Sequence, residues 1–92
     1  MIKNFKHKGL AQFFSHNNKK LLNAKDVPKI NRILDRLDSA VSVKDMNIPG
    51  WDLHELKGER KGVWSVAVRQ NWKITFHFLN GEAYDVNLED YH

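Results

Sequence analysis

The sequence predicts an α+β fold in which two N-terminal helices pack on one face of a twisted, mainly antiparallel sheet. Apolar residues recur at helical spacing in the first half of the chain. From residue 63 onwards they alternate with polar residues at a period of two. Strands with one apolar face need cover on that face only, and the two helices supply it. Because the chain has 92 residues, we expect one domain over 1–92.

The first helix is predicted over residues 7–15, where three apolar residues share one helical face: Leu10, Phe13 and Phe14. The segment MIKNF that precedes it is typical of a short edge strand, anchored by Ile2 and Phe5.

The second helix is predicted over residues 27–41. Its apolar stripe consists of Val27, Ile30, Ile33, Leu34, Leu37 and Val41. Asp26 suits the N-cap, and Pro28 is compatible with a first helical turn only. The segment DMNIPGWD that follows predicts a loop because it contains Pro-Gly.

Three strands are predicted, over residues 63–69, 72–79 and 83–91. The expected core comprises Leu34, Leu37, Trp64, Val66, Ile74, Phe76, Val86 and Leu88. The strand residues among these are all even-numbered, so facing residues must have numbers that add to an even total.

This parity rule predicts how the strands connect. A two-residue Asn80-Gly81 turn would place Phe76 opposite Asp85, so we expect an odd-length loop with Gly81 in a left-handed bulge position. The expected pairs are Phe78–Tyr84, Phe76–Val86 and Ile74–Leu88. By the same count Val68 faces Trp72 across three residues, and Trp72 lies near Asp90.

Charge is distributed unevenly along the chain. Residues 1–44 carry a net charge of +7 and residues 45–92 a net charge of −3. A basic half favours a polyanionic partner, most simply nucleic acid, over the alternative of a solvated lysine-rich surface. The residues expected to form this outer basic surface are Lys19, Lys20, Lys29, Arg32 and Arg36.

Cysteine is absent, so disulfides and thiolate metal sites are excluded. No stretch approaches 18 consecutive apolar residues, and the N-terminus lacks the apolar region of a signal peptide. We therefore expect a cytoplasmic protein without a membrane span.

The face of the sheet opposite the helices is expected to display Arg69, Lys73 and Thr75. Further polar residues are expected close to it. They are Lys57, Arg60 and Lys61 in the connection before the central hairpin, His54 just before them, and Asp90, Tyr91 and His92 at the end of the last strand. Cations stabilise the charge that builds up in phosphoryl transfer, and imidazoles suit proton transfer near neutral pH. A tyrosine ring can stack on an unpaired base. This combination is what RNA cleavage needs when the substrate's own 2′-hydroxyl is the nucleophile, with no metal and no protein nucleophile.

Other interpretations of the same residues stay open. His54 alone fits a surface histidine, EDYH a solvated terminus, and the basic residues near it an exposed turn. His54, Asp90 and His92 are also metal-ligand types, but HELKG has Gly58 where the second histidine of H-E-x-x-H belongs. A structural nucleic-acid-binding domain is a third possibility.

The chain resembles the HigB-type toxins of the RelE superfamily over its whole length. The resemblance depends on MIKNFKHKGL, LHELKGERKGVWSVAVRQNWKITFHF and NGEAYDVNLEDYH. It implies a ribosome-dependent mRNA endonuclease that needs no cofactor and is silenced by a helix-turn-helix HigA-type antitoxin. It also implies binding to the ribosome through 16S rRNA, a free toxin that is monomeric, and the fold described above.

The resemblance assigns roles residue by residue. His54 and Lys57 match the family's LH.LKG segment, and Asp90, Tyr91 and His92 match its terminal DYH. These four, His54 with the terminal three, are the expected catalytic residues. Lys73 departs from the family's NWRITF, because lysine keeps the charge but loses the bidentate fork. The alternative function on the same fold is a non-enzymatic toxin that binds DNA gyrase, as the related ParE toxins do.

Overall fold

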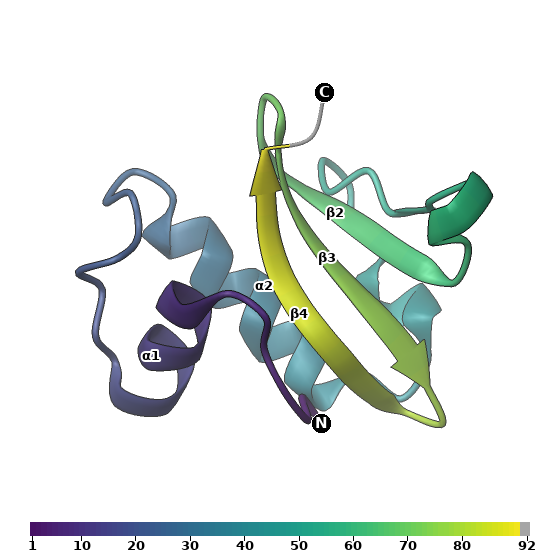
Figure 1. Cartoon of the computed structure of the whole chain (residues 1–92), viewed down its shortest axis with the longest axis horizontal. Helices are drawn as coiled ribbons and strands as arrows, with labels where there is room; N and C mark the ends of the chain where they lie inside the picture. Colours follow the sequence, from purple (N-terminus) through teal and green to yellow (C-terminus); the bar gives the residue numbers. More distant parts are fainter. Residues whose placement is uncertain (91–92) are drawn as a thin grey trace.

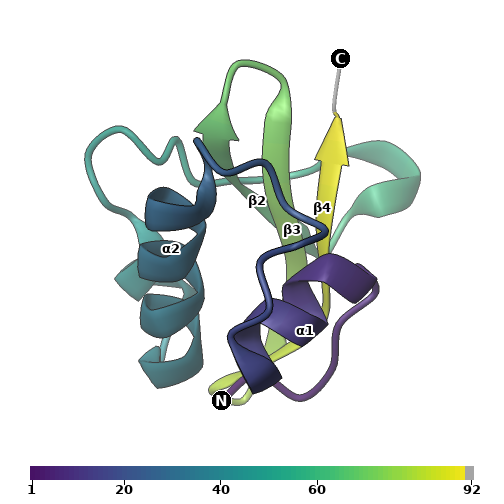
Figure 2. The ribbon, with the colours of Figure 1, turned by 90° about the vertical axis from the view of Figure 1, so that its left-hand side faces the viewer.

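A computed structural model of the chain describes residues 1–90. Two helices lie side by side and cover the same face of a curved antiparallel sheet (Figures 1 and 2). The two ends of the described chain lie at opposite poles of the molecule (Figure 1). The predicted fold class is therefore confirmed.

The elements follow one another without internal repeats. In chain order they are α1 (Lys8–His16), α2 (Val27–Ser39), the 3-10 turn η1 (Val43–Met46), β1 (His54–Glu55), the 3-10 turn η2 (Gly58–Arg60), β2 (Val63–Arg69), β3 (Trp72–Leu79) and β4 (Glu82–Asp90). The strands are arranged in the order β1-β2-β3-β4, so β1 and β4 are the outermost of the four, and the N-terminal segment lies beyond β4. No helix in this part of the chain is long and apolar enough to cross a membrane.

Helix α2 begins where the sequence predicts and ends two residues early. Pro28 lies in its first turn, as expected. Val41 lies outside the helix and is 81% exposed, so its assignment to the apolar stripe was wrong. Asp26 occupies the N-cap position but makes no capping hydrogen bond, because its carboxylate accepts from Arg69 instead.

The core forms where the helical stripes meet the even-numbered residues of the strands. Six of the eight predicted core residues are at most 1% exposed: Leu34, Leu37, Val66, Ile74, Phe76 and Val86. Trp64 and Leu88 are half-buried and pack against this core. The N-terminal segment pairs with β4 through Ile2 and Phe5, which confirms its predicted edge role.

Part of the predicted register is confirmed. Ile74 faces Leu88, as predicted, and Trp64 faces Phe76 and Val66 faces Ile74. The predicted pair Phe76–Val86 is not formed, because the register of β3 and β4 shifts between Thr75 and His77. Trp72 faces Asp90, so the end of β4 lies beside the β2–β3 turn, as predicted for Asp90.

The β3–β4 connection differs from the prediction. Asn80 and Gly81 form a two-residue turn with φ of 52° and 77°, the backbone that an Asn-Gly hairpin turn requires. The extra residue lies within β4, where the register shifts and Asp85 has a φ of 54°. Phe78 therefore faces Ala83 and not Tyr84, and Ala83 takes the buried position. A bulge in the strand keeps the parity of the core just as a longer loop would.

The β2–β3 connection differs in the same way. Arg69, not Val68, faces Trp72 across a two-residue turn, and the register shifts between Ala67 and Arg69. Val68 is the extra residue, so the alternation of sides is displaced by one beyond it. Arg69 consequently does not lie on the face where the sequence predicts it.

Candidate functional site

The face of the sheet opposite the helices carries two rows of polar residues, and we call it the open face. The pairings place His54, Ser65, Thr75 and Asn87 side by side in one row, one residue from each strand. Ala67, Lys73 and Glu89 form the next row. Because residues two apart in a strand share a face, both rows point the same way. The predicted His54 and Lys73 are therefore on one surface.

His54 lies in the edge strand β1 with its side chain 44% exposed. Its Nδ1 is 3.0 Å from the carbonyl oxygen of Asp52, a contact that a protonated Nδ1 makes by donating. In that tautomer the unprotonated Nε2 is the nitrogen available to accept a proton. Asp52 has a φ of 50°, and the turn at this residue brings its carbonyl back to the ring.

An ion pair crosses the open face between η2 and β4. The guanidinium of Arg60 donates to both carboxylate oxygens of Glu89, at 2.8 and 2.6 Å. Thr75 of β3 also donates to Glu89 through its hydroxyl. Hydrogen bonds from Arg60 outweigh the opposing effect of burial and, with the Thr75 bond, lower the pKa of Glu89 to about 2. The sequence predicts Arg60 as a phosphate contact, whereas the structure has its guanidinium engaged by a carboxylate.

This ion pair also changes the expected exposure of the face. Thr75 is predicted on an open surface but is only 2% exposed, because it lies beneath Glu89 and the Arg60 side chain that reaches it. Its neighbour Ser65 is 1% exposed, and its hydroxyl oxygen has no hydrogen-bond partner. The open face is thus a partly covered surface with a buried polar floor.

Three lysines remain as cations around the covered centre. Lys57 and Lys61 are exposed on either side of η2 and border a hollow of about 290 Å³. Gly58, which follows Lys57, has a φ of 70°, a backbone conformation that favours glycine. Lys73 is half-buried on β3, directly opposite Glu89. These three lysines therefore flank the covered centre, whereas Arg60 reaches across it.

Asp90 ends β4, three strands away from His54 in β1. In a flat sheet this separation is about 14 Å. Asp90 faces Trp72 and follows Glu89 of the open face, so alternation places it on the side covered by the helices. The predicted catalytic residues Tyr91 and His92 lie outside the described residues.

Arg69 is the predicted site residue that the structure moves to the other face. Its Nε donates to the buried carboxylate of Asp26 at 2.7 Å. Trp72 and Leu88, on the side covered by the helices, line the same small cavity as this pair. Arg69 therefore connects the β2–β3 turn to the start of α2, because the bulge at Val68 turns it away from Lys73.

The predicted basic surface is divided between α2 and the connection before it. Arg32 and Arg36 are exposed on the outer side of α2, and Lys19 and Lys20 are exposed in the connection. Lys29 is half-buried, with its Nζ 3.4 Å from the carbonyl oxygen of Gly50. Burial, followed by the charges of Arg32 and Lys73, lowers the pKa of Lys29. The basic side of α2 and the lysine of the open face thus contribute to one positive field.

The sequence analysis did not identify two features of the site. Glu89 is the more important of the two. Like Lys73 it has an odd number, so alternation alone places both residues on the open face. The unpartnered Ser65 hydroxyl had no such signal. Among residues 1–90, no three His, Asp or Glu side chains are grouped so that they could hold a metal ion.

Comparison with known proteins gives family matches along the whole chain. Residues 3–92 match the family described as RelE-like toxin of type II toxin-antitoxin system HigB. The Endoribonuclease HigB of Proteus vulgaris is 49% identical over 92 residues, which is the full length of both chains. Toxin HigB-1 of Vibrio cholerae is 30% identical over 91 residues, covering 97% of this chain and 96% of that one.

A solved structure shares the fold at low sequence identity. A histidine-to-glutamine mutant of YafQ from E. coli superposes with a TM-score of 0.51 and 12% identity. The match covers 96% of this chain and 92% of the YafQ chain. This similarity supports the arrangement of helices and strands and carries no further argument.

Proposed function

Because the chain belongs to the HigB family of RelE-like toxins of type II toxin–antitoxin systems, we propose that it is an endoribonuclease that cuts mRNA on the ribosome. The observation that carries the proposal is the exposed His54, which lies on the same face of the sheet as Lys73 and three residues before the exposed Lys57. The full-length similarity to an endoribonuclease supports it.

In the proposed reaction the 2′-hydroxyl of one nucleotide attacks the adjacent phosphate. The P–O5′ bond breaks, leaving a 2′,3′-cyclic phosphate and a 5′-hydroxyl. His54 takes or gives a proton through Nε2, since its Nδ1 is held by the carbonyl of Asp52. His92 is the second acid–base group, and Asp90 orients an imidazole or accepts a proton itself. Tyr91 stacks on a base.

Negative charge on the phosphate is offset by the lysines of the open face. Lys57, Lys61 and Lys73 fill this role in the proposal. Arg69 is left out because its guanidinium is bonded to Asp26 on the other side of the sheet. The pairing with Glu89 makes Arg60 a residue that positions η2 and its flanking lysines.

Docking on 16S rRNA is assigned to the basic surface of α2 and the preceding connection, including Lys19 and Lys20. The toxin family implies an antitoxin partner, and we propose a helix-turn-helix HigA-type protein. A cytoplasmic location and a monomeric free toxin belong to the same proposal.

The proposal is tested by incubating the protein with mRNA, with and without ribosomes, and mapping the new ends. We expect cuts only in the ribosomal reaction, each with a cyclic phosphate on one side and a 5′-hydroxyl on the other. An intact mRNA in both reactions, together with inhibition of gyrase, would instead support the ParE-like function.

A further inference from the structure

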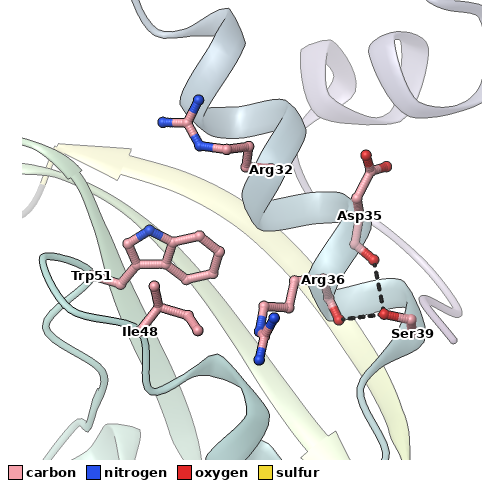
Figure 3. Close-up of a pocket in the computed structure, with 6 residues that line it drawn as sticks. All are labelled: Arg32, Asp35, Arg36, Ser39, Ile48 and Trp51. Carbon is pink, nitrogen blue, oxygen red and sulfur yellow. Dashed lines mark hydrogen bonds between the residues drawn. The ribbon is translucent and has the colours of Figure 1, made fainter.

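A groove of about 390 Å³ lies between the outer side of α2 and the loop that precedes β1 (Figure 3). One wall is a stripe of α2 at helical spacing, and the other comes from the loop. The lining residues are Arg32, Asp35, Arg36, Ser39, Ile48 and Trp51. We call it the α2 groove, and it lies on a different surface from the open face.

Two arginines of α2, Arg32 and Arg36, line the groove. In Figure 3 the guanidinium groups of Arg32 and Arg36 point to opposite ends of the groove, and the indole of Trp51 faces α2 at a level between them. The Nε of Arg36 donates to the carbonyl oxygen of Asp45 at 2.5 Å, which holds that guanidinium in place before any ligand arrives. Two arginines four residues apart weaken a helix, and an anion bound at the groove would lower that cost.

The loop wall is apolar and has limited exposed area. Trp51 is only 7% exposed, and Ile48 is half-buried. This wall suits the edge or face of one flat group and cannot act as a platform for several stacked bases. In Figure 3 the carboxylate of Asp35 points away from the loop wall, which leaves the two arginines as the charged groups at the groove. The groove therefore fits one anionic group joined to one planar group.

We propose that the α2 groove holds one unpaired nucleotide of a folded RNA. Its phosphate contacts the held guanidinium of Arg36, its base contacts Ile48 and Trp51, and Arg32 adds positive charge at the other end of the groove. A guanidinium fork matches a phosphate in shape as well as charge, and unpaired bases are the parts of RNA that proteins bind in such hollows. The inference deepens the proposed docking on ribosomal RNA and rests on it.

Two variants test the groove without altering the net charge of the protein. Replacing both arginines, Arg32→Lys with Arg36→Lys, keeps two positive charges and removes the planar forks. Ser39→Phe fills the groove, and Ser39 is exposed with hydrogen bonds only to carbonyls of its own helix. Asn31→Phe is the matched control, because it adds the same ring at an exposed position of α2 outside the groove.

The probes are purified small ribosomal subunits and, separately, an unstructured labelled oligoribonucleotide, each titrated over a range of salt concentrations. We expect the double arginine variant to bind about 10-fold more weakly, with the salt dependence unchanged because the charge is kept. We expect Ser39→Phe to lose about 10-fold as well, since the base is displaced. Asn31→Phe should bind like the parent protein. Thermal unfolding checks that every variant is folded.

The outcomes separate this inference from the docking on which it rests. A parent protein that binds the oligoribonucleotide but not the ribosomal subunit contradicts ribosome docking, while a loss in the groove variants still supports the nucleotide site. Groove variants that bind both probes like the parent protein overturn the inference. The same holds if they lose only the binding of a protein partner, since the groove would then be a protein-binding surface.

Discussion

The ion pair between Arg60 and Glu89 allows a prediction that links stability to the site. The pair holds η2 against β4. Lys57 and Lys61 lie on either side of η2. The change to make is Glu89→Gln, which keeps the shape of the side chain and the hydrogen bond to Thr75 but removes the charge. Glu59→Gln is the matched control, because Glu59 is an exposed glutamate in the same turn.

The magnitude follows from the pKa of Glu89. A pKa lowered from 4.5 to about 2 corresponds to about 3 kcal/mol of stability at neutral pH. The Glu89 side chain is 20% exposed but the Arg60 side chain is 42% exposed, so solvent screening reduces the expected loss in Glu89→Gln to roughly 1–2 kcal/mol. Urea unfolding followed by tryptophan fluorescence measures this free energy.

The sign of the pH dependence is fixed because the pKa is lower in the folded state. The Glu89 charge contributes fully to the unfolding free energy above the pKa of the unfolded state, near 4.5. This contribution is lost as the pH falls through the folded pKa of about 2. The difference in unfolding free energy between the parent protein and Glu89→Gln should therefore be constant at neutral pH and shrink below pH 4.5. Equal unfolding free energies at pH 7, or a difference that does not change as the pH falls below 4.5, would contradict a stabilising ion pair.

The same variant tests whether the pair positions the lysines. We expect cleavage by Glu89→Gln to fall by roughly 10- to 100-fold, the cost of displacing groups that contact a substrate. Exchanging the two residues, Arg60→Glu with Glu89→Arg, should restore part of the activity because the pair reforms in reverse. Activity that stays low in this exchange variant, with stability recovered, would contradict the positioning role.

Further predictions concern the core and the acid–base groups. Phe76→Ala should lower the unfolding free energy by about 3–5 kcal/mol, measured in urea, because the ring is fully buried; a loss under 1 kcal/mol would contradict the core assignment. Removing Tyr91 and His92 should leave the melting temperature unchanged and reduce cleavage by about 10²–10⁴-fold, and full activity would make these residues a solvated tail. His54→Gln should reduce cleavage over the same range without loss of ribosome binding, and a variant that is inactive only because it fails to bind would contradict a catalytic role.

Much of the fold could be predicted because period-two alternation fixes which side of a strand is buried. That alternation predicted the pair Ile74–Leu88 and the burial of Phe76 and Val86. It could not decide whether the extra residue that keeps the parity lies in the loop or in the strand, because both solutions leave the core unchanged. The structure places it in the strand twice, and for this reason Arg69 faces the helices.

The candidate site was predicted in part for the same reason. Lys73 and Thr75 share a face by alternation, and their strand positions follow directly from the sequence. The link from Arg60 to Glu89 depends on the path of a short 3-10 turn that carries no periodic signal. The α2 groove needs a loop to fold back on a helix, so its Ile48 and Trp51 wall could not be read from spacing.

The proposed nucleophile is the substrate's own 2′-hydroxyl, and one modified substrate tests this directly. Ribosomes are programmed with an mRNA that carries a single 2′-O-methyl group at a mapped cut site, and the products are compared with those of the unmodified mRNA. We expect cleavage at the modified bond to be lost while other sites are cut as before. Continued cutting of the modified bond would contradict this proposal, because the nucleophile would then be water and a metal-assisted reaction would have to be considered.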